Sequence, residues 1–263
     1  MGDSFLAVEA AAGVVERVGA ANRKFVRALD VGSSPEARGV LRPIATDWAT
    51  AKFGDNETLD LSTAHYDLAT SILALHAVND LPGALVQIRR ALKPDGLFVA
   101  AMFGGETLRE LREAFAAGEE DISSGVSPRV APFADIRDLG GLLQRARFNL
   151  PVTDSERTVV RYREFDTLVK DLRAAAETNT QVARSRKFLR RDVLAASLAH
   201  YAARHAEPDG RLRATFDIIY LTGWAPHEGQ QKPLKPGSAK ARLADALRTK
   251  EKSANDTTPI RRG

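Results

Sequence analysis

The chain of 263 residues contains no cysteine. This absence excludes disulfides, thiolate zinc sites, iron–sulfur ligation and cysteine nucleophiles, and it is typical of a reducing compartment such as the cytoplasm. The five histidines do not suggest an iron triad of two imidazoles and a carboxylate. We therefore expect no metal site and a cytoplasmic protein.

Long apolar runs are also missing. No stretch reaches the roughly 20 residues that a membrane-spanning helix needs, so we expect no transmembrane segment. The apolar N-terminal segment 5–18 is interrupted by Glu9, Glu16 and Arg17. It is therefore typical of an amphipathic helix and not of a signal peptide.

Negative charge is scarce at the end of the chain. Residues 229–263 carry nine Lys or Arg and three Asp or Glu, a net charge of +6, so the rest must carry −2 because the whole chain has +4. We expect a folded domain over residues 1–228 and a basic, largely disordered tail over 229–263. Basic tails are more often solvated than specific, and no nucleic-acid partner is expected.

A strand–helix–strand unit over residues 66–108 is the feature around which the chain is organised. The apolar run 67–75 has the length of a strand, and the uninterrupted run 97–103 indicates a strand covered on both faces. Asp80 and Pro82 mark a helix start between them. A unit of this length is a parallel crossover, and parallel sheets bind ligands at the carboxyl ends of their strands.

Polar and small residues follow both strands of this unit. His76 and Asn79 come after the first, and Gly104-Gly105 after the second. An imidazole titrates near neutrality, so His76 could orient a substrate or transfer a proton. It could equally hydrogen-bond the turn at Asn79. We take His76 and Asn79 as the candidate catalytic residues.

The remaining pattern alternates strands with helices and ends in a late antiparallel strand, which predicts an α/β fold of three layers. A Gly-, Ser- and Pro-rich stretch, 118–132, is expected to form a mobile loop over the site. Residues 150–162 form a strand pair or one bulged strand. The other expected strands are 27–31, 43–47 and 214–223, and the expected helices are 5–25, 36–41, 107–116, 134–146, 165–175, 192–206 and 239–247.

Three acidic or small positions early in the chain suggest a nucleoside-type ligand. Gly32 follows Asp30 at the end of the first strand, where glycine lets the backbone approach a ligand and a helix N-terminus can hold an anion. Asp47 is expected at the end of the next strand, where an acid can bind both hydroxyls of a ribose. Asp55, in the following turn, could accept a hydrogen bond from an adenine amino group.

These motifs resemble those of class I S-adenosylmethionine-dependent methyltransferases of the methyltransferase-11 type. Within that class the chain is most similar to bacterial relatives of the NADH:ubiquinone oxidoreductase complex assembly factor 5 family, with the malonyl-carrier-protein methyltransferase as a more distant cousin. The segments that carry the resemblance are 66–68, 75–85, 89–97, 104–108, 220–227 and 230–233.

The resemblance implies a Rossmann-like methyltransferase fold with a seven-stranded, mostly parallel sheet. It implies S-adenosylmethionine as cofactor and a small-molecule or protein acceptor that approaches the two candidate catalytic residues. The family also suggests an alternative: an assembly factor for respiratory complex I that uses the fold to bind complex I subunits or to hydroxylate arginine. The cofactor-binding residues implied are Asp30, Gly32, Ser34, Asp47, Asp55 and Leu75.

The loop after the first strand departs from the class pattern, D-x-G-x-G-x-G. In this chain it reads Asp30-Val31-Gly32-Ser33-Ser34-Pro35-Glu36, with one glycine left. Ser34 places a hydroxyl where the methionine part of the cofactor should pass, and Glu36 adds negative charge near its carboxylate. The departures indicate weakened cofactor binding.

Overall fold

The computed structural model describes residues 5–123, 125–130, 133–175, 188–231 and 248–249. The chain divides into two units, residues 1–227 and residues 228–263. The first unit contains every helix and strand named below. The expected helix 239–247 lies outside the described residues. No helix in the described part of the chain is both long enough and apolar enough to span a membrane.

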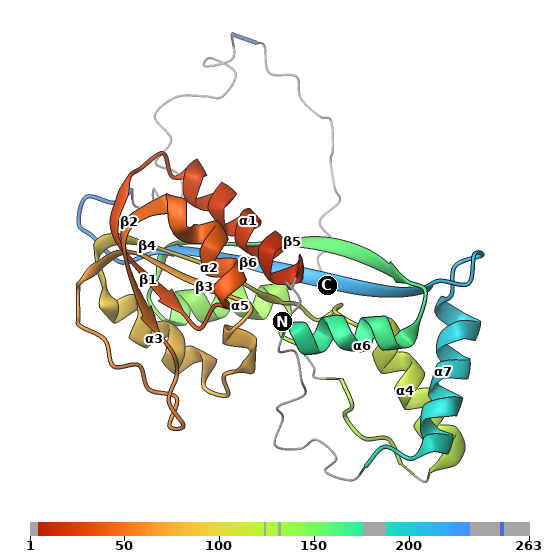
Figure 1. Cartoon of the computed structure of the whole chain (residues 1–263). Coiled ribbons are helices and arrows are strands. Elements are labelled where there is room, and N and C mark those ends of the chain that lie inside the picture. The colour runs from red at the N-terminus through yellow and green to blue at the C-terminus, as the bar shows by residue number, and fades with distance from the viewer. Residues whose placement is uncertain (1–4, 124, 131–132, 176–187, 232–247, 250–263) are drawn as a thin grey trace, which may run out of the picture. The chain divides into compact units, whose positions relative to one another are not determined.

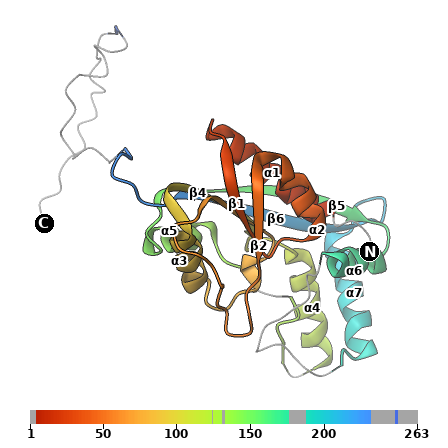
Figure 2. The ribbon, with the colours of Figure 1, turned by 60° about the vertical axis from the view of Figure 1, so that its left-hand side comes forward.

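The first unit is built on one mixed sheet with the strand order β2-β1-β3-β4-β6-β5 (Figures 1 and 2). The first four strands in this order are parallel, and β6 runs antiparallel to both β4 and β5. The strands are β1 (Phe25–Val31), β2 (Ala45–Ala51), β3 (Tyr66–Ile72), β4 (Leu92–Phe103), β5 (Asn149–Tyr162) and β6 (Leu212–Trp224). The late antiparallel strand is confirmed. The expected count of seven strands is wrong, because the described residues form six.

Helices cover both faces of this sheet, which confirms the three layers. In Figures 1 and 2, α1 and α2 lie on one face, and α3 and α5 lie on the other. Two further helices, α4 and α7, pack against each other beside the far ends of β5 and β6. The helices are α1 (Phe5–Ala20), α2 (Pro35–Leu41), α3 (Leu81–Ala91), α4 (Arg109–Ile122), α5 (Ile136–Arg145), α6 (Phe165–Ala174) and α7 (Arg191–His205), with short 3-10 turns η1 (Arg42–Ile44) and η2 (Leu75–Ala77).

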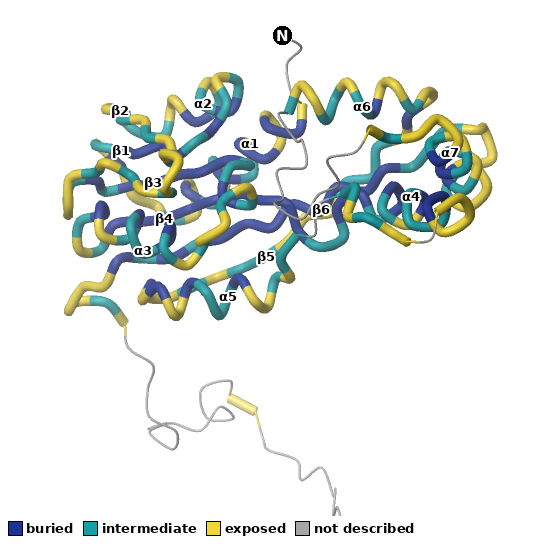
Figure 3. Tube along the Cα trace, turned by 90° about the horizontal axis from the view of Figure 1, so that it is seen from below, coloured by how far each residue is buried: buried dark blue, intermediate teal, exposed yellow. Residues whose placement is uncertain are grey.

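The central strands are buried on both faces, as their apolar runs predict. On β4, Val99 belongs to the apolar core under α1 and α2, while its neighbour Phe98 belongs to the core under α3 and α5. Alternation of this kind follows from the two-residue period of a strand. Figure 3 shows the buried residues running along β3, β4 and β6. The central sheet therefore holds the two cores together.

Local signals give the beginning of α3 correctly. Asp80 is the N-cap, and its carboxylate accepts the backbone N–H of Gly83 at 2.9 Å. Proline is tolerated in the first turn, because the backbone N–H that it lacks would have no acceptor within the helix. An N-cap of this type is typically worth about 1 kcal/mol.

Several element boundaries differ from the prediction. The first helix ends at Ala20, not at residue 25, because Asn22 adopts a left-handed φ of 47° and Phe25 begins β1. The predicted loop 118–132 begins too early: α4 continues to Ile122, and Gly118 packs against Ser197 of α7. The apolar period of α4 is interrupted by the Glu-Glu-Asp run, so the sequence pattern does not report the last turn of the helix. Tertiary packing decides the length of the helix instead.

Two strand boundaries also differ. β3 ends at Ile72, three residues before the expected end, and Leu75 begins the turn η2. The strand expected over 97–103 begins earlier, because β4 starts at Leu92 and includes Asp95, which adopts a left-handed φ of 61°. The stretch 150–162 belongs to the single strand β5, with a register shift between Asn149 and Val152, so the bulged alternative is confirmed.

Candidate functional site

The carboxyl ends of β1, β3 and β4 meet at one edge of the sheet, and Gly32 makes the turn that follows β1. Its φ is +78°, a left-handed conformation that side chains rarely adopt. A Cβ placed there would lie 2.8 Å from the Cβ of Ala74. The N–H of Gly32 donates to the carbonyl of Ala51 at 2.9 Å. The turn therefore depends on glycine, and it leaves backbone without a side chain at the expected cofactor edge.

Asp30 is buried at the end of β1, with 1% of its surface exposed. Burial raises the pKa of the Asp30 carboxyl above its ordinary value, although hydrogen bonds and the positive charge of Arg38 oppose this effect. The Ser33 hydroxyl donates to Asp30, and that same hydroxyl oxygen accepts the N–H of Ile72 at 2.9 Å. Asp30 and Ser33 thus tie the end of β1 to the end of β3.

Ser34 is the N-cap of α2. Its hydroxyl accepts the N–H of Ala37 at 3.3 Å, so the side chain satisfies one of the free backbone donors at the start of this helix. That donor would otherwise be available to an anion such as the carboxylate of a ligand. The hydroxyls of Ser33 and Ser34 are therefore both used inside the protein, and α2 has only seven residues.

The expected position of Asp47 at the carboxyl end of its strand is wrong. β2 continues to Ala51, and Asp47 lies near its amino end, opposite Arg27 of β1. The two side chains form an ion pair at 3.3 Å. The expected strand 43–47 ends at the acid, whereas backbone pairing with β1 continues the strand by four residues to Ala51. No acid stands at the end of β2, where the chain continues with Lys52.

Asp55 lies in the turn after β2 and is exposed. Its neighbour Glu57 anchors this turn to the start of α3. The Glu57 carboxylate accepts the backbone N–H of Asn79 at 2.8 Å, the Asn79 side-chain amide at 2.6 Å and the N–H of Asp80 at 2.7 Å. These backbone hydrogen bonds hold the pKa of Glu57 below its ordinary value. The side chain of Asn79 is thereby bound to Glu57, a contact that no spacing in the sequence signals.

His76 follows β3 in the turn η2 and lies among aromatic side chains. Its ring centroid is 5.2 Å from that of Phe103, the last residue of β4, and 5.6 Å from that of Phe133. The preceding residue, Leu75, is fully buried in the core beneath α3. The sequence interpretation did not single out Phe103 or Phe133, because one ends an apolar strand and the other lies in a loop.

Asp217 is a further residue at this edge that the sequence interpretation missed. It is 7% exposed, on β6 beside the end of β4, and the N–H of Gly104 donates to its carbonyl at 2.7 Å. Burial raises the pKa of its carboxyl, an effect that nearby Arg157 opposes. The signal was available: an acid within the apolar run 214–221 is unusual for a buried strand.

No group of three or more His, Cys, Asp or Glu side chains is arranged to hold a metal ion among the residues the structure describes. His65 and Asp67 have the His-x-Asp spacing that a metal site could use, but they have a structural role at the opposite end of β3. The Asp67 carboxylate accepts the backbone N–H groups of Val26 and Arg27, and the Arg27 guanidinium contacts the His65 ring at 2.9 Å. Both residues therefore lie away from the carboxyl edge.

Comparison with known proteins places the chain in a family. The model of a methyltransferase domain matches residues 8–100. The protein named arginine-hydroxylase NDUFAF5, mitochondrial, of Danio rerio is 36% identical over 92% of this chain and 81% of its own length. The chain belongs to the NDUFAF5 family. Other relatives of that name are matched over between 41% and 60% of their own length.

More distant proteins agree with this placement. Malonyl-[acyl-carrier protein] O-methyltransferase of Xylella fastidiosa (strain M23) is 34% identical over 66% of this chain and 57% of its own length. Among solved structures, the YcgJ protein of Bacillus subtilis aligns with a TM-score of 0.56 at 12% identity, covering 82% of this chain and 99% of that protein. This NDUFAF5 relative thus has the domain and the Rossmann-like fold of a class I S-adenosylmethionine-dependent methyltransferase.

The residues present fit the cofactor of that class in part. The Gly32 turn exposes backbone at the end of β1, which suits the close approach of the methionine half. For the ribose half, an acid at the end of β2 is the usual ligand, and Ala51 ends this strand. The first acid after β2 is Asp55, four residues further along the chain.

Proposed function

We propose that the chain is an S-adenosylmethionine-dependent methyltransferase with weak cofactor binding, whose cofactor lies across the carboxyl ends of β1 and β3. The observation that carries this proposal is the glycine-dependent turn at Gly32, placed directly beside the residues that precede His76. Asp30 would stabilise that turn through Ser33, and Asp55 would face the adenosine half, while Leu75 is buried in the core and would support the turn from beneath. Asp47 is too far from this edge to join them.

The cofactor supplies a methyl group that already carries its own leaving group, so the protein mainly orients the acceptor and excludes water. In this proposal His76, with Phe103 and Phe133 beside it, forms the wall against which the acceptor rests. Asn79 has a positioning role, because its side chain is bound to Glu57. Ser33 and Ser34 already make internal hydrogen bonds, which accounts for the weak binding.

Calorimetric titration of the full chain with S-adenosylmethionine and S-adenosylhomocysteine tests the proposal. We expect a Kd of about 10 to 100 µM, or about −7 to −5.5 kcal/mol. Gly32→Ala should abolish the binding, since the new Cβ would meet Ala74 in a strained backbone conformation. Gly19→Ala is the matched control, because nothing lies within 4 Å of a Cβ at that glycine.

Substitution of two aspartates in the same titration tests which residue binds the ribose side of the cofactor. Asp55→Ala should weaken binding, whereas Asp47→Ala should leave it unchanged because Asp47 pairs with Arg27 near the amino end of β2. If Asp47→Ala weakened binding and Asp55→Ala did not, the assignment of the ribose side would be wrong. A folded full-length chain that binds neither cofactor form, with folding checked by circular dichroism, would refute the methyltransferase proposal.

A second candidate function comes from the name of the zebrafish relative, arginine-hydroxylase, which is matched over 92% of this chain. On this candidate the fold binds subunits of respiratory complex I and supports their assembly or the hydroxylation of an arginine. A pull-down of these subunits with the full chain tests the interaction. Mass spectrometry of the bound subunits separates the reactions, since methylation adds one CH2 unit and hydroxylation adds one oxygen atom.

The compartment is part of the same proposal. We propose a cytoplasmic location, whereas the names of the NDUFAF5 relatives carry the word mitochondrial. Cell fractionation followed by detection of the chain distinguishes the two locations. Recovery of the chain outside the cytoplasmic fraction would contradict this part of the proposal.

A further inference from the structure

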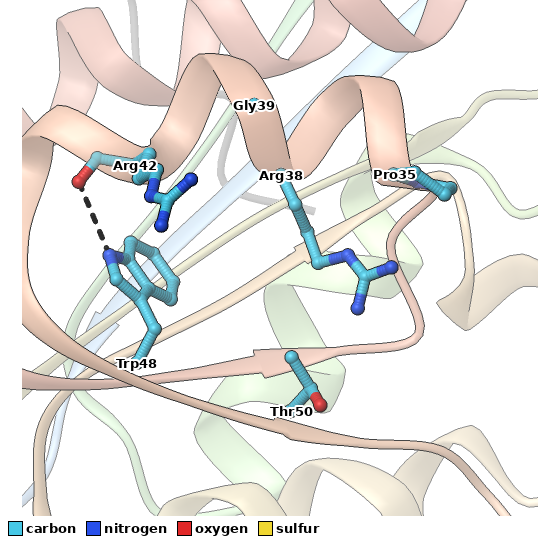
Figure 4. Close-up of a pocket in the computed structure, with 6 residues that line it drawn as sticks. All are labelled: Pro35, Arg38, Gly39, Arg42, Trp48 and Thr50. Carbon is cyan, nitrogen blue, oxygen red and sulfur yellow. Dashed lines mark hydrogen bonds between the residues drawn. The ribbon is translucent and has the colours of Figure 1, made fainter.

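A pocket of about 400 Å³ lies between α2 and the edge strand β2, outside the residues assigned to the cofactor (Figure 4). It exists because α2 alone covers this part of β2. The connection from β2 to β3, residues 52–65, contains no helix, and its apolar side chains pack with the core under α3 on the opposite face. The pocket is lined by Pro35, Arg38, Gly39, Arg42, Trp48 and Thr50.

Two arginines give this pocket a positive charge. Figure 4 shows the side chains of Arg38 and Arg42 extending from α2 and its end toward β2. Within the described part of the chain, neither guanidinium makes a hydrogen bond or an ion pair. Arg38 is attracted by the buried carboxyl of Asp30, which already accepts the Ser33 hydroxyl. The acid on β2, Asp47, forms its ion pair with Arg27 and not with the pocket.

The charge of Glu36, on the first turn of α2, is held by other groups. Its carboxylate is stabilised chiefly by its own backbone N–H and by the Ser34 hydroxyl, which keep the pKa of Glu36 below its ordinary value. Arg38 contributes a weaker attraction. Arg38 and Arg42 therefore line the pocket, and Glu36 is not among the residues that line it.

Trp48 and Thr50 form the β2 side of the pocket. The indole of Trp48 is half-buried, and its ring N–H donates to the carbonyl of Arg42 at 3.3 Å. The polar end of the indole is thus occupied, and its ring contributes a surface for stacking. Thr50 adds one hydroxyl on the same face of β2. Arginine forks bind the paired oxygens of phosphate and carboxylate groups well.

We infer that the pocket between α2 and β2 binds a small organic anion, a phosphate monoester or a carboxylate with a planar body. The anionic group is held by Arg38 and Arg42, and the planar body stacks on Trp48. A free metabolite and the anionic end of an acceptor share this chemistry. The ligand is distinct from the cofactor, whose expected residues include none of the six that line the pocket.

Tryptophan fluorescence offers a direct test, because the chain has two tryptophans. Trp224→Phe in the full chain leaves Trp48 as the sole reporter. Titration with phenyl phosphate should change its emission saturably, with a Kd of about 0.1 to 1 mM. Phenol and inorganic phosphate, the two halves of the probe, should each bind at least about tenfold more weakly, since each lacks one set of contacts.

Variants locate the site. Arg38→Gln combined with Arg42→Gln should weaken phenyl phosphate binding at least about tenfold, because charge-assisted forked hydrogen bonds are lost. Arg90→Gln, on the exposed side of α3, is the control and should change nothing. Calorimetry on the unsubstituted chain repeats the measurement without relying on Trp224→Phe.

Three results would overturn the inference. The first is the lack of a saturable response in both measurements, and the second is equal affinity in the double-arginine variant. The third is displacement of phenyl phosphate by S-adenosylhomocysteine, which would make the pocket part of the cofactor site. The reverse outcome, binding of both without competition, supports a separate site even if the methyltransferase proposal fails.

Discussion

The two halves of the parallel sheet differ in how firmly they are built. In the half formed by β3, α3 and β4, nearly every strand residue after the first few is buried on both faces. In the half formed by β1, α2 and β2, the edge strand β2 has no fully buried residue, and a seven-residue helix covers it. The central half therefore supplies most of the stability, whereas the edge half carries the open surfaces on which ligands can bind.

The comparison also shows where polar groups are placed. The central half has its polar residues at its ends, such as Asp80, which caps α3. The edge half buries Asp30 inside, and its two pocket arginines, Arg38 and Arg42, make no ion pair with any residue that the structure describes. A buried carboxyl and unpaired charges both lower the free energy of unfolding. Natural proteins therefore keep such groups mainly at sites that bind a ligand.

The largest predicted effect concerns the central half. Phe98 is fully buried on β4, and its ring stacks on that of Phe148 with centroids 5.1 Å apart. Phe98→Ala should lower the free energy of unfolding by about 3 to 5 kcal/mol, since it leaves a cavity. Trp48→Ala on the edge strand should cost less than about 2 kcal/mol, because Trp48 is half-exposed already. Urea unfolding measures both, and equal losses would contradict the difference between the halves.

A smaller effect is expected from the buried acid of the edge half. Because burial raises the pKa of Asp30, the folded state prefers the protonated carboxyl. The contribution of the protonated Asp30 carboxyl to the free energy of unfolding is complete below its ordinary pKa of 3.8. This contribution is lost as the pH rises through the raised pKa. Asp30→Asn, which keeps an oxygen for the Ser33 hydroxyl, should remove this loss and raise the free energy of unfolding at pH 7.

The measurement is the free energy of unfolding of both proteins across that pH range. Asp60→Asn, at an exposed position in the loop before β3, serves as the control and should leave the pH dependence unchanged. If Asp30→Asn were less stable than the unsubstituted chain at pH 7 and equal to it below pH 3.8, the carboxylate would be stabilised by its neighbours instead.

The smallest effect is local and concerns the contact between the two halves. Glu57→Gln removes a carboxylate that accepts three N–H groups from Asn79 and Asp80. Backbone amide exchange at these two residues should speed up roughly tenfold while global unfolding stays the same. Glu120→Gln, exposed on α4, is the control. Unchanged exchange at Asn79 would mean that α3 begins correctly without this anchor.

Acidification should have the same local consequence in the unsubstituted chain. The pKa of Glu57 is depressed below 4.5, so its hydrogen bonds are complete above that pH and are lost as the pH falls through the depressed value. The side-chain amide signal of Asn79 in an NMR titration should move in that window. A movement centred above pH 4.5 would contradict the assigned cause.

Much of the fold was predictable from local patterns. The apolar run 97–103 and the cap at Asp80 each report on a few neighbouring residues, so the central strands and α3 were recognised. The site was less predictable. Asp47 was expected beside the cofactor, but the register of β2 against β1 places it at the other end of the strand. That register depends on backbone pairing between segments about 20 residues apart, which no local pattern reports.

The sequence by itself determined the α/β class, the family and the carboxyl edge at which His76 and Gly32 lie. Periodicity, capping and turn residues act over one or two turns of chain, and the class and the edge follow from them. The family follows from the resemblance of whole segments such as 75–85 to known proteins. Only the tertiary structure decided that Asn79 is bound by Glu57, that Phe133 lies against His76, and that an open pocket separates α2 from β2. Those outcomes depend on contacts between distant segments, whose geometry is set by the packing of the whole sheet.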